Sequence, residues 1–258
     1  MKRLYRILLL FAFIVWTVIV TGQEKRYTTA NGHAHNDYLN PRPFYQAYEN
    51  GFGSIEADIF PVGGKLLVAH RRDEIKKENT LTRLYIEPLL KEMKAGHSRK
   101  VFLLIDIKQD HKTCLQLLIS DLEPLQTYLA KPGVQGPLTV VISGERPLPP
   151  DYRNYPEFIF YDSDLKQKHS ADEWARVALV SLPFNKLSGW KGDRDPVEDE
   201  LRSVKNIIDS VHRAGKPIRF WAAPDNVLSW EWQKKLKVDL IGTDRIRELS
   251  EFLKSESN

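Results

Sequence analysis

The stretch that decides the fold is Ser54-Ile55-Glu56-Ala57-Asp58-Ile59-Phe60. Successive side chains of a strand point to opposite faces, so Glu56 and Asp58 share one face while the apolar residues around them occupy the other. Burying two neighbouring carboxylates without a counter-charge forces protonation or costs free energy, at about 1.4 kcal/mol per pKa unit. This strand therefore indicates a buried polar site that holds a cation.

Short apolar runs of this kind alternate with longer amphipathic segments along the chain. This alternation is typical of repeated strand and helix units around a parallel sheet. The predicted main strands are 27–33, 54–59, 101–107, 137–143, 157–161, 176–182, 217–222 and 238–243, with 65–69 as a hairpin partner of the second. Eight main strands is the number of the TIM (β/α)8 barrel, so we predict an α/β fold of that type in a single domain.

Helices are expected between these strands. The clearest amphipathic stripe consists of Leu201, Val204, Ile207, Ile208 and Val211. The predicted helices are near 43–50, 80–94, 111–129, 198–214, 226–236 and 245–255. No long helix is expected at 147–156, because several prolines interrupt that segment.

The first residues indicate export. Three basic residues precede an uncharged apolar run at 7–20, and the small Gly22 offers a cleavage position. We therefore predict a signal peptide at 1–22 and a folded domain at 23–258. The apolar run is shorter than the roughly 20 residues that span a bilayer, so we expect a periplasmic or extracellular protein with no stable membrane span after cleavage. An uncleaved N-terminal anchor is the alternative.

Charge and cysteine content exclude further classes. The formal net charge is +4, and much of it lies in the predicted signal peptide, so the remaining chain is close to neutral and no nucleic-acid partner is expected. The single cysteine, Cys114, excludes an intramolecular disulfide. Stability must therefore come from burial of apolar side chains.

Polar side chains gather where the early strands end, and in a TIM barrel these ends build the active site. The residues at these ends are His33, His35 and Asn36 after the first strand, His70 after the hairpin partner, and Asp106 and Lys108 at the end of the third. Asp106 adds a third carboxylate to Glu56 and Asp58, which makes an oxygen-rich site suited to Mg²⁺ or Ca²⁺. A salt bridge with Lys108 is the alternative role of Asp106. Two histidines at the same mouth suit acid/base catalysis near neutral pH.

At these residues the sequence resembles the PLC-like phosphodiesterase superfamily, which includes glycerophosphodiester phosphodiesterases, phosphatidylinositol-specific phospholipase C and sphingomyelinase D. The matching segments are 32–33, 54–59, 67–70, 104–108, 219–226 and 239–244. Through His33-Ala34-His35-Asn36-Asp37-Tyr38 the chain is most similar to the subgroup of altered inheritance of mitochondria proteins.

The resemblance implies a metal-dependent phosphoric diester hydrolase over 23–258. It would act on a glycerophosphodiester or a phospholipid-derived head group through a cyclic phosphate intermediate. The implied site residues are Glu56, Asp58 and Asp106 for Mg²⁺ or Ca²⁺, His33 and His70 for general acid/base catalysis, and Lys108 and Trp221 for the substrate. His35 is the alternative to His33 as the first residue of the acid/base pair.

Two departures from the superfamily leave the phosphate contact open. Glycerophosphodiester phosphodiesterases have Arg after the first histidine and Asp after the second, whereas this chain has Ala34 and Arg71. The phosphate contact is therefore expected from Arg71, Arg72 or Lys108. His35 and Asn36 are expected to lie beside the substrate.

Two other interpretations stay open. His33 and His35 are similar to the metal-binding histidine pair of amidohydrolases and of the polymerase-and-histidinol-phosphatase domain. The other interpretation is a non-catalytic barrel that binds a phosphorylated ligand or a glycan. Its candidate stacking surfaces are Trp190, Trp221, Trp230 and Trp232.

Overall fold

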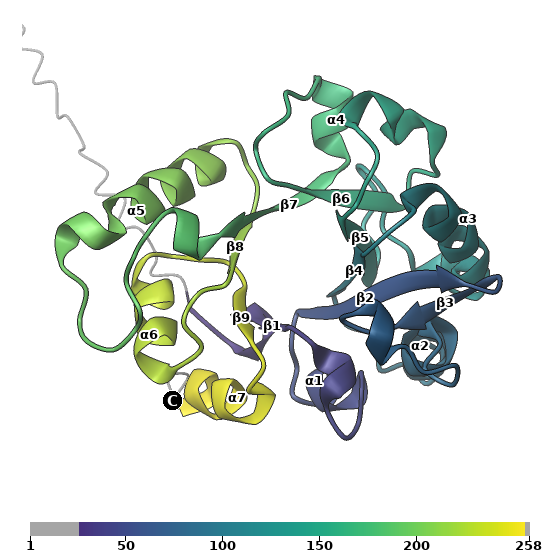
Figure 1. Cartoon of the computed structure of the whole chain (residues 1–258), viewed down its shortest axis with the longest axis horizontal. Coiled ribbons are helices and arrows are strands. Elements are labelled where there is room, and N and C mark those ends of the chain that lie inside the picture. The colour runs from purple at the N-terminus through teal and green to yellow at the C-terminus, as the bar shows by residue number, and fades with distance from the viewer. Residues whose placement is uncertain (1–25, 256–258) are drawn as a thin grey trace, which may run out of the picture.

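The structure is a computed structural model that describes residues 26–255, and these form a barrel of parallel strands surrounded by helices (Figure 1). The strands are β1 (Gly32–Ala34), β2 (Ser54–Val62), β3 (Lys65–Val68), β4 (Val101–Ile107), β5 (Leu138–Gly144), β6 (Ile159–Ser163), β7 (Val177–Pro183), β8 (Ile218–Trp221) and β9 (Ile241–Thr243). All neighbours pair in parallel except β3, which runs antiparallel to β2. A parallel bridge between Arg219 and Leu240 joins β8 to β9. The predicted TIM barrel is confirmed.

The strand predictions differ most from the structure at the first strand. Residues Thr29–Asn31 form a 3-10 turn, and β1 begins only at Gly32. The Thr28 hydroxyl accepts a hydrogen bond from the backbone of Ala30, and the Asn31 side chain accepts one from the backbone of Thr28. These side-chain bonds give the backbone an alternative to the sheet, so the strand starts late.

The helices are α1 (Tyr45–Glu49), α2 (Glu87–Lys94), α3 (His111–Asp121), α4 (Ala171–Ala175), α5 (Glu198–Arg213), α6 (Val227–Lys235) and α7 (Ile246–Ser255). The predicted helix at 111–129 was too long, because Pro124 interrupts it and lies in the first turn of a separate 3-10 segment, Glu123–Tyr128. The short α4 was not predicted, although Ser170 and Glu173 form a capping box at its start. The segment at 147–156 holds a 3-10 turn and no α-helix, as expected.

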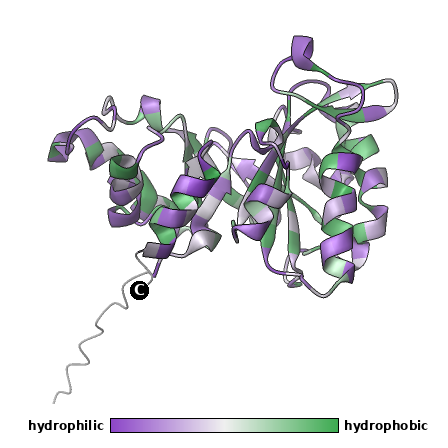
Figure 2. Cartoon of the chain, turned by 90° about the horizontal axis from the view of Figure 1, so that it is seen from below, coloured by the Kyte–Doolittle hydropathy of each residue, from purple (hydrophilic) through white to green (hydrophobic). Residues whose placement is uncertain are grey.

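Amphipathic helices cover the barrel. On α5, the buried residues are Leu201, Val204, Ile208 and Val211, which pack against Val180 of β7 and Phe220 of β8. Each such side chain stabilises the fold by about 1.5–3 kcal/mol when fully buried. Figure 2 shows mixed hydrophobic and hydrophilic faces on these helices, around strands that are largely hydrophobic.

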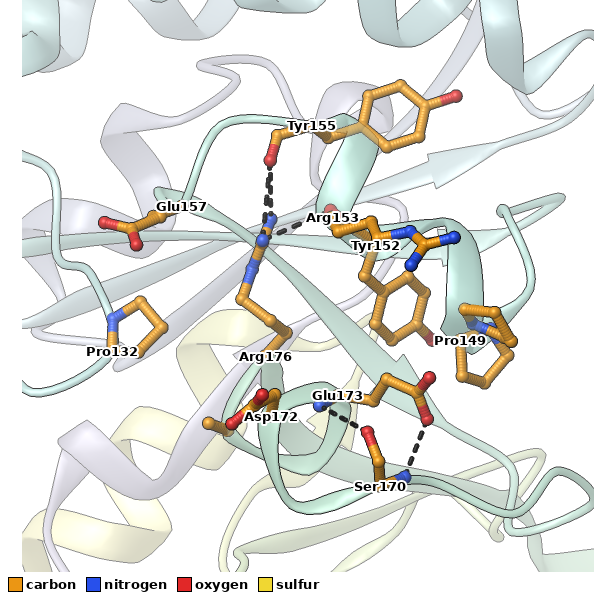
Figure 3. A pocket seen from close by; sticks show the side chains of 12 residues that line it. Pro132, Pro149, Tyr152, Arg153, Tyr155, Glu157, Ser170, Asp172, Glu173 and Arg176 are labelled. Carbon is orange, nitrogen blue, oxygen red and sulfur yellow. Dashed lines mark hydrogen bonds between the residues drawn. The ribbon is translucent and has the colours of Figure 1, made fainter.

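A pocket of about 550 Å³ surrounds the side chain of Arg176, the residue that precedes β7 (Figure 3). This guanidinium is buried, and its hydrogen bonds run to the backbone carbonyls of Tyr152, Tyr155, Pro156 and Ile159. Because these carbonyls precede or begin β6, Arg176 ties together the N-terminal ends of β6 and β7. The pocket thus lies at the end of these strands opposite to that at which a TIM barrel carries its active site.

No helix within residues 26–255 is long and apolar enough to cross a membrane. The predicted signal peptide at 1–22 lies outside the described residues.

Candidate active site

The three predicted metal-binding carboxylates come together at the C-terminal end of the barrel. Glu56 and Asp58 lie on β2, and Asp58 is the register partner of Asp106 on β4. One oxygen from each of the three lies within 4.8 Å of the others, and Glu56 and Asp58 are almost fully buried. The strand alternation in Ser54–Val62 therefore puts both carboxylates inside the barrel, as the sequence predicts.

Two cationic side chains form ion pairs with these three carboxylates. Lys108 Nζ lies 2.8 Å from Asp58 Oδ2 and 2.7 Å from Asp106 Oδ2. Arg219 NH1 donates to Glu56 Oε2 at 2.8 Å. Burial raises the pKa of Asp106 to about 6, against the attraction of Lys108. Burial alone would also raise the pKa of Glu56, but Arg219 and His33 hold it far below its usual value.

The two predicted catalytic histidines each contact one carboxylate of β2. His33 is 1% exposed, with Nδ1 2.7 Å from Ser54 Oγ and Nε2 2.7 Å from Glu56 Oε2. Burial and the nearby Arg219 lower the pKa of His33 to about 4, so its imidazole is neutral at neutral pH. His70 is half-exposed, and its Nδ1 lies 3.0 Å from Asp58 Oδ2.

The loop after β1 brings a further histidine to the same mouth. His35 Nδ1 lies 2.8 Å from Oδ1 of Asp244, the residue that follows β9, and Asn36 Nδ2 donates to the same oxygen at 3.2 Å. Burial lowers the pKa of His35, but Asp244 and Glu56 outweigh it and raise the pKa overall. From the same loop, the Tyr38 hydroxyl donates to Asp58 Oδ2 at 2.8 Å. The loop therefore couples β9 to the carboxylates of β2.

A pocket of about 150 Å³ opens beside this group. Its polar and aromatic lining includes His33, His35, Arg219, Trp221, Asp225 and Asp244. Trp221 lines this pocket and is 47% exposed. The predicted substrate residues His35 and Trp221 thus share one cavity.

The structure does not bring the predicted Arg71 into this group. Its guanidinium is exposed, and it pairs with Asp73 at 3.3 Å and Glu74 at 2.7 Å in its own loop. Arg72 is also exposed and donates to Gln109 at 2.6 Å. The buried arginine that reaches the carboxylates is Arg219, for which no role was predicted.

The sequence pattern that could have identified Arg219 is that it is the single charged residue in the apolar predicted strand 217–222. It lies two positions before Trp221 and therefore on the same face of the strand. Its guanidinium donates from Nε to Ser181 Oγ on β7 at 2.8 Å. A second missed group is the buried pair of Ser143 on β5 and Asp162 on β6, which are 2.7 Å apart. Arg219 and Ser143 lie in predicted strands, and Asp162 lies just after the predicted strand 157–161. Their inward direction depends on how the barrel closes.

The chemistry of the carboxylate group fits a hard divalent cation. Three carboxylates offer oxygen ligands of the kind that Mg²⁺ and Ca²⁺ prefer. Within residues 26–255, this is the one group of three or more potential ligands close enough to hold an ion, and it includes no histidine. The composition of the group argues against the amidohydrolase interpretation, in which His33 and His35 would bind the metal.

Residues 24–99 match the family model of the AIM6-like phosphodiesterase domain. The altered inheritance of mitochondria protein 6 homolog of Arthroderma benhamiae is 28% identical over 228 residues, covering 74% of this chain and 72% of the relative. The corresponding protein of Eremothecium gossypii is also 28% identical, over 85% of this chain and 68% of its own length.

Solved structures share the fold at low sequence identity. A glycerophosphodiester phosphodiesterase from Parabacteroides distasonis has a TM-score of 0.58 and 15% identity, over 91% of this chain and 99% of its own. A calcium-dependent phosphoinositol-specific phospholipase C from Pseudomonas has a TM-score of 0.56 and 15% identity, with coverages of 86% and 92%. A phosphodiesterase from Oleispira antarctica, solved with its product sn-glycerol-3-phosphate, has a TM-score of 0.53 and 12% identity, with coverages of 89% and 94%. In sequence the chain is thus similar to the altered inheritance of mitochondria protein 6 relatives, and its barrel is similar to those of glycerophosphodiester phosphodiesterases and phosphoinositol-specific phospholipase C.

Proposed function

We propose that the protein is a metal-dependent phosphoric diester hydrolase. The observation that carries this proposal is the buried group of Glu56, Asp58 and Asp106, with one histidine on each carboxylate of β2. The AIM6-like phosphodiesterase domain supports the reaction class. The shared fold with enzymes named for glycerophosphodiesters and phosphoinositides supports a glycerophosphodiester or phospholipid-derived head group as substrate.

Glu56, Asp58 and Asp106 would hold the cation, Mg²⁺ or Ca²⁺. When bound, such an ion acts as a Lewis acid that stabilises the negative charge developing on the phosphoryl oxygens. Lys108 bridges two of these carboxylates, so it fixes their direction and lowers the cost of burying them together. Tyr38 gives Asp58 a further donor.

His33 and His70 are proposed as the acid/base pair. One imidazole takes the proton of the attacking hydroxyl, and the other donates a proton to the departing alcohol oxygen. When the attacking hydroxyl belongs to the substrate itself, the product is a cyclic phosphate, and the two histidines exchange roles to open it with water. Glu56 and Asp58 orient the two rings through their hydrogen bonds.

The test is divalent-dependent hydrolysis of bis(p-nitrophenyl) phosphate, glycerophosphocholine and phosphatidylinositol, with ³¹P NMR to detect a cyclic intermediate. His33→Ala and His70→Ala should each lower kcat by roughly 10²–10⁴-fold, the usual contribution of a general acid or base. His35→Ala should lower kcat much less, because we place His35 beside the substrate. His97→Ala is the matched control, since His97 is an exposed histidine that pairs with Glu92.

Two results would overturn the proposal. Turnover that survives both His33→Ala and His70→Ala would remove the acid/base pair. Binding of glycerol phosphate without turnover of any of the three diesters would favour the non-catalytic interpretation.

We also propose that the protein acts outside the cytoplasm, on the strength of the basic and apolar pattern at 1–22. Cell fractionation of the full chain tests this, together with N-terminal sequencing of the product. A cytoplasmic protein that keeps Met1 would refute export.

A further inference from the structure

Arg219 is a buried guanidinium at the mouth of the barrel. It lies on β8 and is 5% exposed. Its Nε donates to Ser181 Oγ at 2.8 Å, and its NH1 donates to Glu56 Oε2 at 2.8 Å and also contacts His33 Nε2. Arginine has five N–H donors, and NH2 makes no hydrogen bond to another residue in the described part of the chain. Arg219 therefore retains donors that no neighbour uses.

The charges around Arg219 make these donors important. Its carboxylate partner is Glu56, which belongs to the group of three that would hold a cation. Lys108 brings one positive charge to the other two carboxylates, so two cationic side chains face three carboxylates. A bound divalent cation would raise the total to four positive charges against three carboxylates, which leaves one buried positive charge in excess. Such a charge is costly unless an anion pairs with it. Loading of the carboxylates thus favours an anion beside Arg219.

Space for that anion exists next to the guanidinium. The pocket of about 150 Å³ is lined by Arg219, His35 and Trp221, and His33 contributes to the same wall. The pocket joins the carboxylate group through Arg219 and His33, which both contact Glu56. A small anion in this pocket would lie beside Arg219 and the imidazoles of His33 and His35, and Arg219 and His33 would separate it from Glu56.

Other arginines near this end of the barrel already pair with neighbouring side chains. Arg71 pairs with the carboxylates of its own loop, and Arg72 donates to Gln109. Arg146 lies 3.3 Å from Asp162 and 3.5 Å from Asp164. Among these side chains, Arg219 combines deep burial, unused donors and contact with the carboxylate group.

We propose that Arg219 is the phosphate-binding residue of this site, and that its unused N–H groups bind the non-bridging oxygens of the phosphoryl group in the pocket. The inference rests on the proposed phosphodiester hydrolase function, because it assigns the phosphoryl group to the cavity beside the carboxylates. A guanidinium presents a planar fork that matches phosphate oxygens, and such charge-assisted hydrogen bonds are about twice as strong as neutral ones.

The probe is inorganic phosphate, measured by isothermal titration calorimetry on the full chain with saturating Mg²⁺ or Ca²⁺. Arg219→Gln should weaken phosphate binding by at least about tenfold, since it removes a charged hydrogen-bond donor. Arg219→Lys keeps the charge without the fork and should retain part of the affinity. With a diester substrate, both variants should also lower kcat/KM.

A separate readout distinguishes phosphate binding from support of the carboxylates. Arg219 competes with a cation for Glu56, so cation affinity, measured by terbium luminescence, should stay the same or rise in Arg219→Gln. Arg176→Gln is the matched control, because it removes another buried arginine, which lies at the N-terminal ends of β6 and β7. This control should lower Tm while phosphate affinity stays at the wild-type value.

Wild-type phosphate affinity in Arg219→Gln would overturn the inference, and so would a parallel loss of cation affinity. The experiments also test the proposed hydrolase function independently of this inference. If no diester is turned over but phosphate binding still depends on Arg219, the anion site stands without the reaction. If diesters are hydrolysed with an unchanged kcat/KM in Arg219→Gln, the reaction stands without this role for Arg219.

Discussion

Asp37 is a fully buried carboxyl group within the loop that carries His35 and Tyr38. Its Oδ2 accepts hydrogen bonds from the backbone N–H of Phe44 at 2.5 Å and from the Tyr85 hydroxyl at 3.0 Å. Its Oδ1 has no hydrogen-bond partner in the described part of the chain. Burial raises the pKa of Asp37 from 3.8 to about 6, so this group should make the stability of the fold depend on pH.

The direction of this dependence follows from the two pKa values. The folded protein holds the Asp37 proton more tightly than the unfolded chain, so the contribution to stability is fully present below the unfolded-state pKa. It is lost as the pH rises through the folded-state pKa of about 6. The difference of the two values corresponds to a loss of about 3 kcal/mol at neutral pH.

The assay compares the wild type with Asp37→Asn. The amide keeps an acceptor oxygen for the Phe44 N–H and the Tyr85 hydroxyl but does not titrate. We would measure the free energy of unfolding in urea from about pH 4 to about pH 7. Over that range the variant should gain about 2 kcal/mol relative to the wild type. Parallel curves for the two proteins would refute the reasoning, whatever their offset.

Three further predictions concern the carboxylate group. Asp106→Asn removes one of three carboxylates and should weaken terbium binding at least about tenfold; equal binding would contradict the ligand role. Tyr38→Phe removes the donor to Asp58, and because hydrogen bonds to charged groups contribute about 1.5–3 kcal/mol, kcat/KM should fall about tenfold or more. Gly144→Ala would overlap Asp106 Oδ1 at a φ of +70°, so it should lower both Tm and terbium affinity. The control Gly96→Ala, at a φ of +78° in open space, should lower Tm alone.

The carboxylate group could be predicted because it depends on short-range rules. Alternation along β2 fixes the common direction of Glu56 and Asp58, and the order of parallel strands puts Asp106 next to them. The positions of the histidines follow from the same rule, since strand ends meet at one face of a barrel, whereas their acid/base role was expected mainly from the resemblance. These features need no knowledge of how the barrel closes.

Arg219 and Asp244 could not be placed in the same way. Arg219 meets His33 across 186 positions, and Asp244 meets His35 across 209, because β9 returns beside β1. Whether a strand residue points inward depends on the register of its neighbours, which the sequence of β8 does not encode locally. Trp221 was expected at the site from the resemblance to the superfamily, whereas the arginine two residues earlier contacts Glu56.

The short elements were missed for a different reason. With five residues, α4 has too few turns for a periodic pattern, although its capping box was readable from Ser170 and Glu173. The first strand was overextended because local side-chain hydrogen bonds at Thr28 and Asn31 compete with the sheet.

Lys108 and Arg219 also affect how the proposed cation would enter the site. These two side chains act as built-in counter-ions, so the carboxylates are largely compensated in the protein alone. Many small metal-binding domains are unfolded without their ion, because the unpaired ligands oppose folding. A barrel with its own counter-ions would instead fold first and exchange them for the proposed cation afterwards. A chelator should then abolish the proposed diester hydrolysis without unfolding the protein, and adding the ion back should restore hydrolysis.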